Sequence, residues 1–284
     1  MQFKLHHTIL LACLVIASIT VSAQQSNSRG NNGKSGDTAL NRALGIKKDT
    51  TMAHRLLLVP FEPKMLMSEI GKDINAKTHQ SYNAITDELR EELDMAMYSS
   101  LRRSCVTVDL LDGRQHSDSM LAYIYGSTSY SYDMVPGTAP DQGSKDKNKT
   151  GRYINNGQLE VPVDYSQRFM NINILNPNLL KELGSRYNTD TYVFINELDI
   201  KNVDNNATNL SDETYRRQVI VHYSIVDNTG HFVSKGIATT YFPYSENDPK
   251  EIGAKYFTVI GRIILKNYVQ GLVSDAKVKE QKKK

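Results

Sequence analysis

The 284-residue chain has no tryptophan, only two cysteines and little excess charge. Two cysteines cannot build a multi-bridge scaffold, so the small disulfide-stapled folds are excluded. A formal net charge of +3 is too small to favour nucleic acid, whose binding domains usually carry a clustered basic surface. Beyond the N-terminus, no apolar run approaches the ~18 residues that a membrane helix needs. Hydrophobic residues still make up 39% of the chain, which is enough to form a core.

Residues 1–23 have the pattern of a secretory signal peptide. Lys4 gives a weakly basic start, and an apolar run over residues 8–21 follows. Val21-Ser22-Ala23 then supplies the small residues that precede a cleavage site, so we predict cleavage between Ala23 and Gln24. The mature protein is therefore expected in the periplasm or associated with the outer membrane.

Two alternatives to this cleavage remain open. Leu10-Leu11-Ala12-Cys13 resembles a lipobox, in which Cys13 would be acylated and become the first residue. The apolar run continues past Cys13 and few apolar residues precede it, which favours cleavage at Ala23. An uncleaved anchor is the other alternative, although the run is short for a membrane span.

Two polar tails flank the predicted domain. Residues 24–52 are rich in Gln, Ser, Asn and Gly, a composition that predicts a flexible linker. Residues 275–284 contain five lysines, a composition that predicts a basic disordered tail. Weak attraction of this tail to an anionic surface is the functional alternative. One domain over residues 53–274 remains between them.

Within that domain, patterns typical of strands and helices alternate. Apolar residues recur every four positions over 82–103, which predicts an amphipathic helix. Asn176-Pro177 opens a second helix, because Asn caps and Pro fits the first turn. The remaining predictions are strands at 55–61, 105–111, 191–200, 218–226 and 231–242, and helices at 117–125 and 252–272. This order predicts an α/β (α+β) fold, with a mixed sheet of about five or more strands packed with two or three main helices.

An insertion over about 126–170 interrupts this pattern. Ser, Thr and Tyr nearly alternate over 126–132, and residues 136–152 contain almost no apolar side chains. The second stretch predicts a surface loop or a disordered segment. Residues 158–163 and 169–175 are possible strands that return to the body of the domain. A pore-forming hairpin is a further interpretation of the alternation, but membrane strands need ~9–11 alternating residues and this run is shorter.

Four segments, taken in order, carry a resemblance to a known fold family. They are RLLLVPFEP, ITDELREELDMAMYSSLRRSCVTVDLL, LLKELGSRYNTDTYVFINEL and VIVHYSIVDNTGHFVSKGIATTY. Together they resemble the TolB amino-terminal domain and CsgG-like periplasmic domains, over most of residues 54–272. The resemblance implies an envelope protein that binds other proteins, as a scaffold, an activator of wall synthases or a subunit of a secretion pore. It supplies no catalytic residues to carry over, and fold alone does not decide function.

The reactive side chains give no pattern typical of catalysis or metal binding. The histidines have no helical metal-ligand spacing, and ordinary structural roles are expected for His222, on a strand, and His231, near a hairpin tip. Asp109 and Asp112 lie at the end of a predicted strand. Aspartates at such positions commonly form turns, and a catalytic role is the alternative. Cys105 is expected to be a buried thiol. We therefore predict no catalytic, cofactor-binding or metal-binding residue, no cofactor, and a protein that is not an enzyme.

The tyrosines in and around the insertion are the candidate partner-binding residues. Tyrosine supplies a large contact area at low entropic cost, although packing of the loop onto the body is an equally good interpretation. The candidates are Tyr123, Tyr125, Tyr130, Tyr132, Tyr153 and Tyr165.

The leading hypothesis is a periplasmic protein-binding or scaffold domain of a secretion or wall-assembly machine. Its expected partner is another envelope protein, and self-association is the second option. The alternatives are a secreted hydrolase acting on glycan or peptide, and an oligomeric outer-membrane export component.

Overall fold

The computed structural model describes residues 54–112, 118–134, 153–155, 158–160, 168–203 and 216–281. The predicted signal peptide, its cleavage pair Ala23 and Gln24, the linker over 24–52 and Tyr165 lie outside these residues. Tyr153 lies in a described strand, but its side chain is outside the description. Contacts divide the chain into residues 1–35 and 36–284, and all described residues belong to the second unit.

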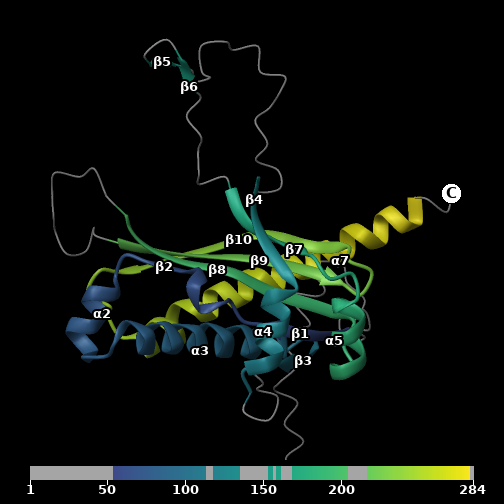
Figure 1. Cartoon of the computed structure of the whole chain (residues 1–284), viewed down its shortest axis with the longest axis horizontal. Helices are drawn as coiled ribbons and strands as arrows, with labels where there is room; N and C mark the ends of the chain where they lie inside the picture. Colours follow the sequence, from purple (N-terminus) through teal and green to yellow (C-terminus); the bar gives the residue numbers. More distant parts are fainter. Residues whose placement is uncertain are drawn as a thin grey trace, which may run out of the picture. The chain divides into compact units, whose positions relative to one another are not determined.

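A six-stranded mixed sheet forms the centre of this unit (Figure 1). Its order is β10-β9-β8-β1-β3, and β2 pairs with β8 beside β1. The pairs that involve β1 or β2 are parallel, whereas β8, β9 and β10 run antiparallel. The bounds are β1 Arg55–Val59, β2 Leu66–Ser68, β3 Val106–Asp109, β8 Thr191–Val203, β9 Arg216–Asp227 and β10 Phe232–Pro243. The predicted mixed α/β fold is confirmed.

The helices α3 (Tyr82–Leu101) and α7 (Thr258–Gln281) pack against each other and cover one face of the sheet. The Ser81 hydroxyl caps α3 by accepting a hydrogen bond from the Ala84 N–H, and the apolar stripe predicted from the sequence is buried. Three shorter segments adjoin these helices: α2 (Gly71–Thr78), α6 (Pro249–Ile252) and the π-helical turn η3 (Gly253–Phe257). The larger apolar core lies between this layer and the sheet.

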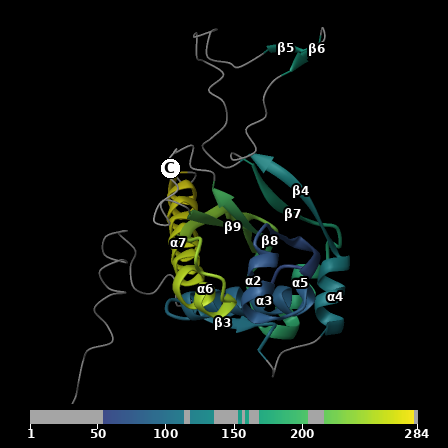
Figure 2. The same ribbon diagram turned by 90° about the vertical axis from the view of Figure 1, so that its left-hand side faces the viewer.

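The opposite face is covered by α4 (Asp118–Gly126), α5 (Leu179–Tyr187) and a two-stranded ribbon of β4 (Thr128–Met134) and β7 (Arg168–Ile174). Figure 2 shows α4, β4 and β7 on the other side of the sheet from α7. A smaller apolar core joins α4, α5 and Ile172 of β7 to the sheet. This second layer contributes residues to both candidate sites of the domain.

The structure adds elements that the sequence pattern does not predict. They are the 3-10 turn η1 (Pro63–Met65), β2 and α2, all short, and β4, which turns the Ser/Tyr alternation at the start of the predicted insertion into a strand paired with β7. β5 (Tyr153–Asn155) and β6 (Gln158–Glu160) pair with each other. Where a disordered tail was predicted over 275–284, α7 continues through Gln281. Within the described ranges, every helix is too short or too polar to cross a membrane.

Candidate functional site

Two of the predicted tyrosines are packed into the body of the domain. The Tyr125 hydroxyl donates to the Pro60 carbonyl at 2.9 Å and accepts from Arg90 Nη2 at 2.8 Å. Burial raises the pKa of Tyr125 to about 12. Tyr130 packs against both apolar cores, and burial raises its pKa as well. For these two residues the structure shows packing of the segment onto the domain.

The other two described tyrosine side chains remain at the surface. Tyr123 on α4 is 38% exposed, and Tyr132 on β4 is 55% exposed. They belong to two different sites, so the structure does not gather the tyrosines into one surface. Tyr123 lines a groove between α4 and α5, whereas Tyr132 lies beside Glu197 between the ribbon and the sheet.

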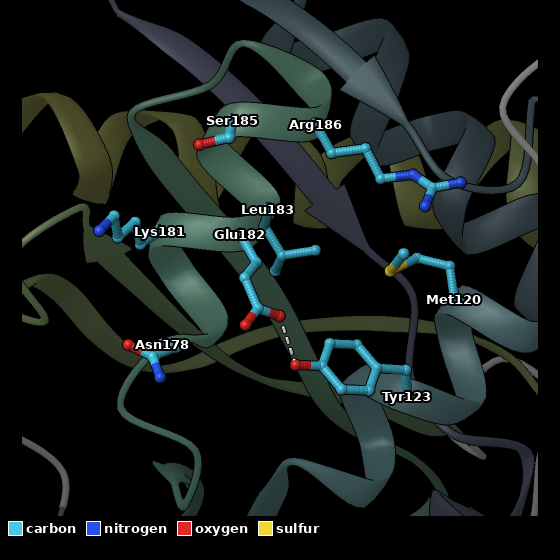
Figure 3. Close-up of a pocket in the computed structure, with 8 residues that line it drawn as sticks. All are labelled: Met120, Tyr123, Asn178, Lys181, Glu182, Leu183, Ser185 and Arg186. Atoms are coloured by element: carbon cyan, nitrogen blue, oxygen red, sulfur yellow. Dashed lines mark hydrogen bonds between the residues drawn. The ribbon is translucent and has the colours of Figure 1, made fainter.

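The groove between α4 and α5 has a volume of about 580 Å³ and is open to solvent (Figure 3). Figure 3 shows Lys181 and Arg186 on opposite sides, with Leu183 and Glu182 between them. Its residues combine an apolar floor with charged and polar walls: Met120, Tyr123, Asn178, Lys181, Glu182, Leu183, Ser185 and Arg186. None of these eight is a histidine or a cysteine.

Hydrogen bonds hold the Tyr123 ring in one orientation within this groove. Its hydroxyl donates to Glu182 Oε2 at 2.5 Å and accepts from Asn176 Nδ2 at 2.7 Å. The bond to Glu182 raises the pKa of Tyr123, because the carboxylate favours the protonated phenol. The Asn176 side chain is itself fixed, since its Oδ1 accepts from the Asn178 N–H at 3.0 Å. The ring is therefore preorganised for contact.

A second polar cluster is buried between the sheet and the ribbon. Glu197 and Asp199 on β8 and His222 on β9 are 1%, 4% and 4% exposed. His222 Nε2 lies 3.5 Å from Glu197 Oε1 and 3.7 Å from Asp199 Oδ2. Lys201 Nζ lies 2.6 Å from Asp199 Oδ2 and supplies one positive charge at the edge of the cluster.

A β-bulge at Asn196 places the two carboxylates on this face. Before it, Val193 and Ile195 point into the helix-side core, and after it Leu198 and Ile200 do so. The register jumps by one residue, from Ile195 opposite Tyr223 to Glu197 opposite His222. Without the extra residue, strand alternation would direct Glu197 into the apolar core under α3 and α7.

The carboxylates of the cluster titrate in opposite directions. Burial, followed by repulsion from Asp199, raises the pKa of Glu197 to about 7. Burial also acts to raise the pKa of Asp199, but interactions with His222 and Lys201 outweigh it and lower that pKa below its ordinary value. We therefore expect Glu197 to hold the proton first as the pH falls.

The donor set of one histidine and two carboxylates is typical of a divalent-metal site, but the orientation of His222 does not fit one. His222 Nδ1 accepts a hydrogen bond from the Met170 backbone N–H at 2.8 Å. The neutral ring must then carry its hydrogen on Nε2, the nitrogen that faces the carboxylates. A metal ligand needs a lone pair on that nitrogen, so the residues present do not fit a metal ion.

Sequence reasoning assigned His222 an ordinary structural role and missed this cluster. The available signal was Glu-x-Asp at the end of one predicted strand, followed by a histidine in the next. That signal was insufficient, because the bulge and the register with β9 decide on which face of the sheet the two carboxylates lie.

Asp109 and Cys105 make contacts that are typical of structural residues. Asp109 Oδ1 accepts from the Leu111 N–H at 2.8 Å, which is the turn-forming role weighed against catalysis. Asp109 also interacts with Asp94, whose pKa burial raises well above its usual range. Cys105 is a buried free thiol, as predicted, and burial raises its pKa to about 12.

No protein-family model matches the chain, and no curated protein matches its sequence. The resemblance to TolB amino-terminal and CsgG-like domains thus stays a prediction from the order of the sequence segments.

Proposed function

We propose that the chain is a non-enzymatic protein-binding domain of the bacterial cell envelope, and that the groove between α4 and α5 is its binding site. The single observation that carries this proposal is the Tyr123 ring, which Glu182 and Asn176 hold in place beside an open groove. A fixed aromatic side chain loses little entropy on binding, and such residues often dominate binding energy at interfaces. The partner is another envelope protein, within a secretion or wall-assembly machine.

The charges of the groove favour an acidic partner segment with an apolar anchor. Lys181 and Arg186 place positive charge on opposite sides of the groove, while the Glu182 carboxylate already accepts a hydrogen bond from Tyr123. Met120 and Leu183 supply apolar contact area next to the Tyr123 ring. Complementary charge of this kind steers association and selects among partners.

The hydrolase alternative has less support in the groove. Hydrolysis by a serine needs a base within hydrogen-bonding reach, and Ser185 has no histidine among its fellow lining residues. The pore-hairpin interpretation, which is one of the two bases of the export-component alternative, rests on the alternation of residues 126–132. That alternation is accounted for by β4, which pairs with β7 while Tyr130 packs into the cores.

Site-specific photocrosslinking in living cells tests the proposal. A photoreactive amino acid at Ser185, inside the groove, is expected to capture a discrete envelope protein. The same probe at Tyr241 on β10, which is 49% exposed and outside the groove, is the control. Tyr123→Ala and, separately, Lys181→Glu with Arg186→Glu are each expected to reduce the adduct at least about tenfold.

The outcomes separate clearly. No adduct at Ser185, or the same adduct from both probe positions, would overturn the proposal. An adduct that survives both sets of substitutions would show that Tyr123 and the positive charges of Lys181 and Arg186 do not select the partner.

A further inference from the structure

The β4–β7 ribbon is tied to the sheet by side chains that occupy the place of a neighbouring strand. The Met170 N–H donates to His222 Nδ1 at 2.8 Å, and the Met170 carbonyl accepts from Asn196 Nδ2 at 2.8 Å. Both polar backbone groups of this β7 residue are thus bonded to the sheet rather than to β4. Asn196 and His222 together hold the edge of β7 against β8 and β9.

The bond from Met170 to His222 exists in only one charge state of the ring. In neutral imidazole, Nδ1 can accept the Met170 N–H while Nε2 carries the hydrogen. In the imidazolium form both nitrogens carry hydrogen, and two N–H groups then face each other across the contact. A single proton taken from solvent by the Nδ1 lone pair therefore abolishes this bond.

The opposite edge of the ring faces an excess of buried negative charge. Glu197 and Asp199 bring two carboxylates, and Lys201 brings one ammonium group. Glu197 Oε2, Asp199 Oδ1 and His222 Nε2 are buried, and none of the three has a hydrogen-bond partner. An unpaired buried carboxylate is costly, so the cluster gains free energy by taking up a cation. Because Nε2 carries hydrogen, the cation that fits is a proton.

We propose that Glu197, Asp199 and His222 form a proton-operated clasp that holds the edge of β7 on the sheet and releases it on acidification. Protons enter in two steps. The first neutralises Glu197, whose pKa burial raises to about 7. The second goes to His222 Nδ1, the atom that accepts the Met170 N–H, and it breaks that bond.

Other charged or titratable groups surround the clasp, but His222 is the one among them that bonds the Met170 N–H. On β4, Tyr132 lies beside Glu197. The neighbouring Asp133 Oδ2 accepts hydrogen bonds from Lys235 Nζ of β10 at 3.0 Å and from Asn171 Nδ2 at 2.8 Å. On β8, Lys201 stays paired with Asp199. On β7 the charged residue is Arg168, at its start. The contacts of Asp133 hold the rest of the ribbon, so the release is local to the edge at Met170.

Hydrogen exchange of individual backbone amides in the full processed chain tests the clasp. Between pH 8 and pH about 4.5, the protection factor of the Met170 amide, corrected for intrinsic exchange, is expected to fall at least about tenfold. The Val221 amide, in the core strand β9, is expected to stay protected over the same range. Protection that stays constant at Met170, or that falls equally at Val221, would overturn the proposal.

Two variants identify the responsible group. In His222→Asn, the amide oxygen can accept the Met170 N–H but cannot titrate, so protection at Met170 should not change with pH. In the control His231→Asn, at an exposed histidine that lies 3.1 Å from Asp275, the wild-type fall should persist. An unchanged fall in His222→Asn would show that another group operates the ribbon.

A measurement on the unmodified chain covers the case in which His222→Asn does not fold. The ¹⁵N shifts of the His222 ring are expected to show hydrogen on Nε2 near pH 8 and on both nitrogens after acidification. Hydrogen on Nδ1 near pH 8 would overturn the proposal. So would a specific change at Nε2 on adding Zn²⁺, because it would make the cluster a metal site.

Discussion

At the scale of single residues, Arg217 on β9 is the largest completely buried side chain in the part of the chain that the structure describes. Its guanidinium donates to Asp73 of α2, to Asn202 of β8 at 3.2 Å, and to the Glu246 carbonyl at 3.0 Å. The group also lies 4.2 Å above the Tyr244 ring. One planar cation thus joins three segments that are distant in the sequence, a geometry that lysine cannot reproduce.

Substitution of this residue should therefore destabilise the fold strongly. We expect Arg217→Leu to lower the free energy of unfolding by about 3 kcal/mol, because several part-buried polar partners lose their donor. Arg216→Leu, at the exposed neighbouring position, is the matched control and should change it by less than about 0.5 kcal/mol. Urea denaturation of both variants measures the difference, and equal midpoints would contradict the assigned role.

Glu197 gives a pH dependence with a definite sign. Its pKa is higher in the folded protein, about 7, than the ordinary value of 4.5, so the folded state binds this proton more tightly. The contribution of Glu197 to stability is therefore full below pH about 4.5 and is lost as the pH rises toward 7. We expect Glu197→Gln to raise the free energy of unfolding at pH 8 by roughly 1 to 3 kcal/mol relative to wild type. Denaturation at pH 5 should show a much smaller difference, and a gain that is the same at both pH values would contradict the assignment.

At the scale of elements, α7 is positioned by a close backbone approach to β10. A Cβ added at Gly271 would overlap the Val233 carbonyl oxygen, an atom of the strand backbone that cannot rotate away. We expect Gly271→Ala to destabilise the protein by about 1 to 3 kcal/mol despite the better helix propensity of alanine. Gly126→Ala, at the end of α4 where an added Cβ meets nothing within 4 Å, should be neutral or slightly stabilising. Thermal unfolding compares the two, and equal melting temperatures would show that α7 can shift.

The same scale shows how far sequence alone predicts this fold. The helix α3 was predicted to within a few residues, because the spacing of its apolar residues is a local signal. The ribbon strand β4 was not predicted, because Ser and Tyr alternate there without an apolar face and β7 provides the pairing from about 40 residues away. The groove has one predicted residue, Tyr123, and its partner Glu182 comes from a helix whose position depends on the whole second layer.

At the scale of the whole molecule, the proposed location in the envelope rests on the predicted signal peptide. We expect the exported protein to begin at Gln24, which intact mass and N-terminal sequencing would show. A diacylglyceryl adduct on Cys13 would instead support the lipobox interpretation, and a retained Met1 would support an anchor. Removing residues 1–23 from the gene should leave the protein inside the cell.

The bulge at Asn196 makes β8 unusually sensitive to the deletion of a single residue. Most substitutions within a strand alter one side chain, but deletion of Asn196 would shift the frame of every residue after it. Glu197 and Asp199 would then enter the apolar core, and Leu198 and Ile200 would face the ribbon. Point changes and single-residue deletions at this position therefore test different properties: the first removes one hydrogen-bonding side chain, and the second exchanges the two faces of half a strand.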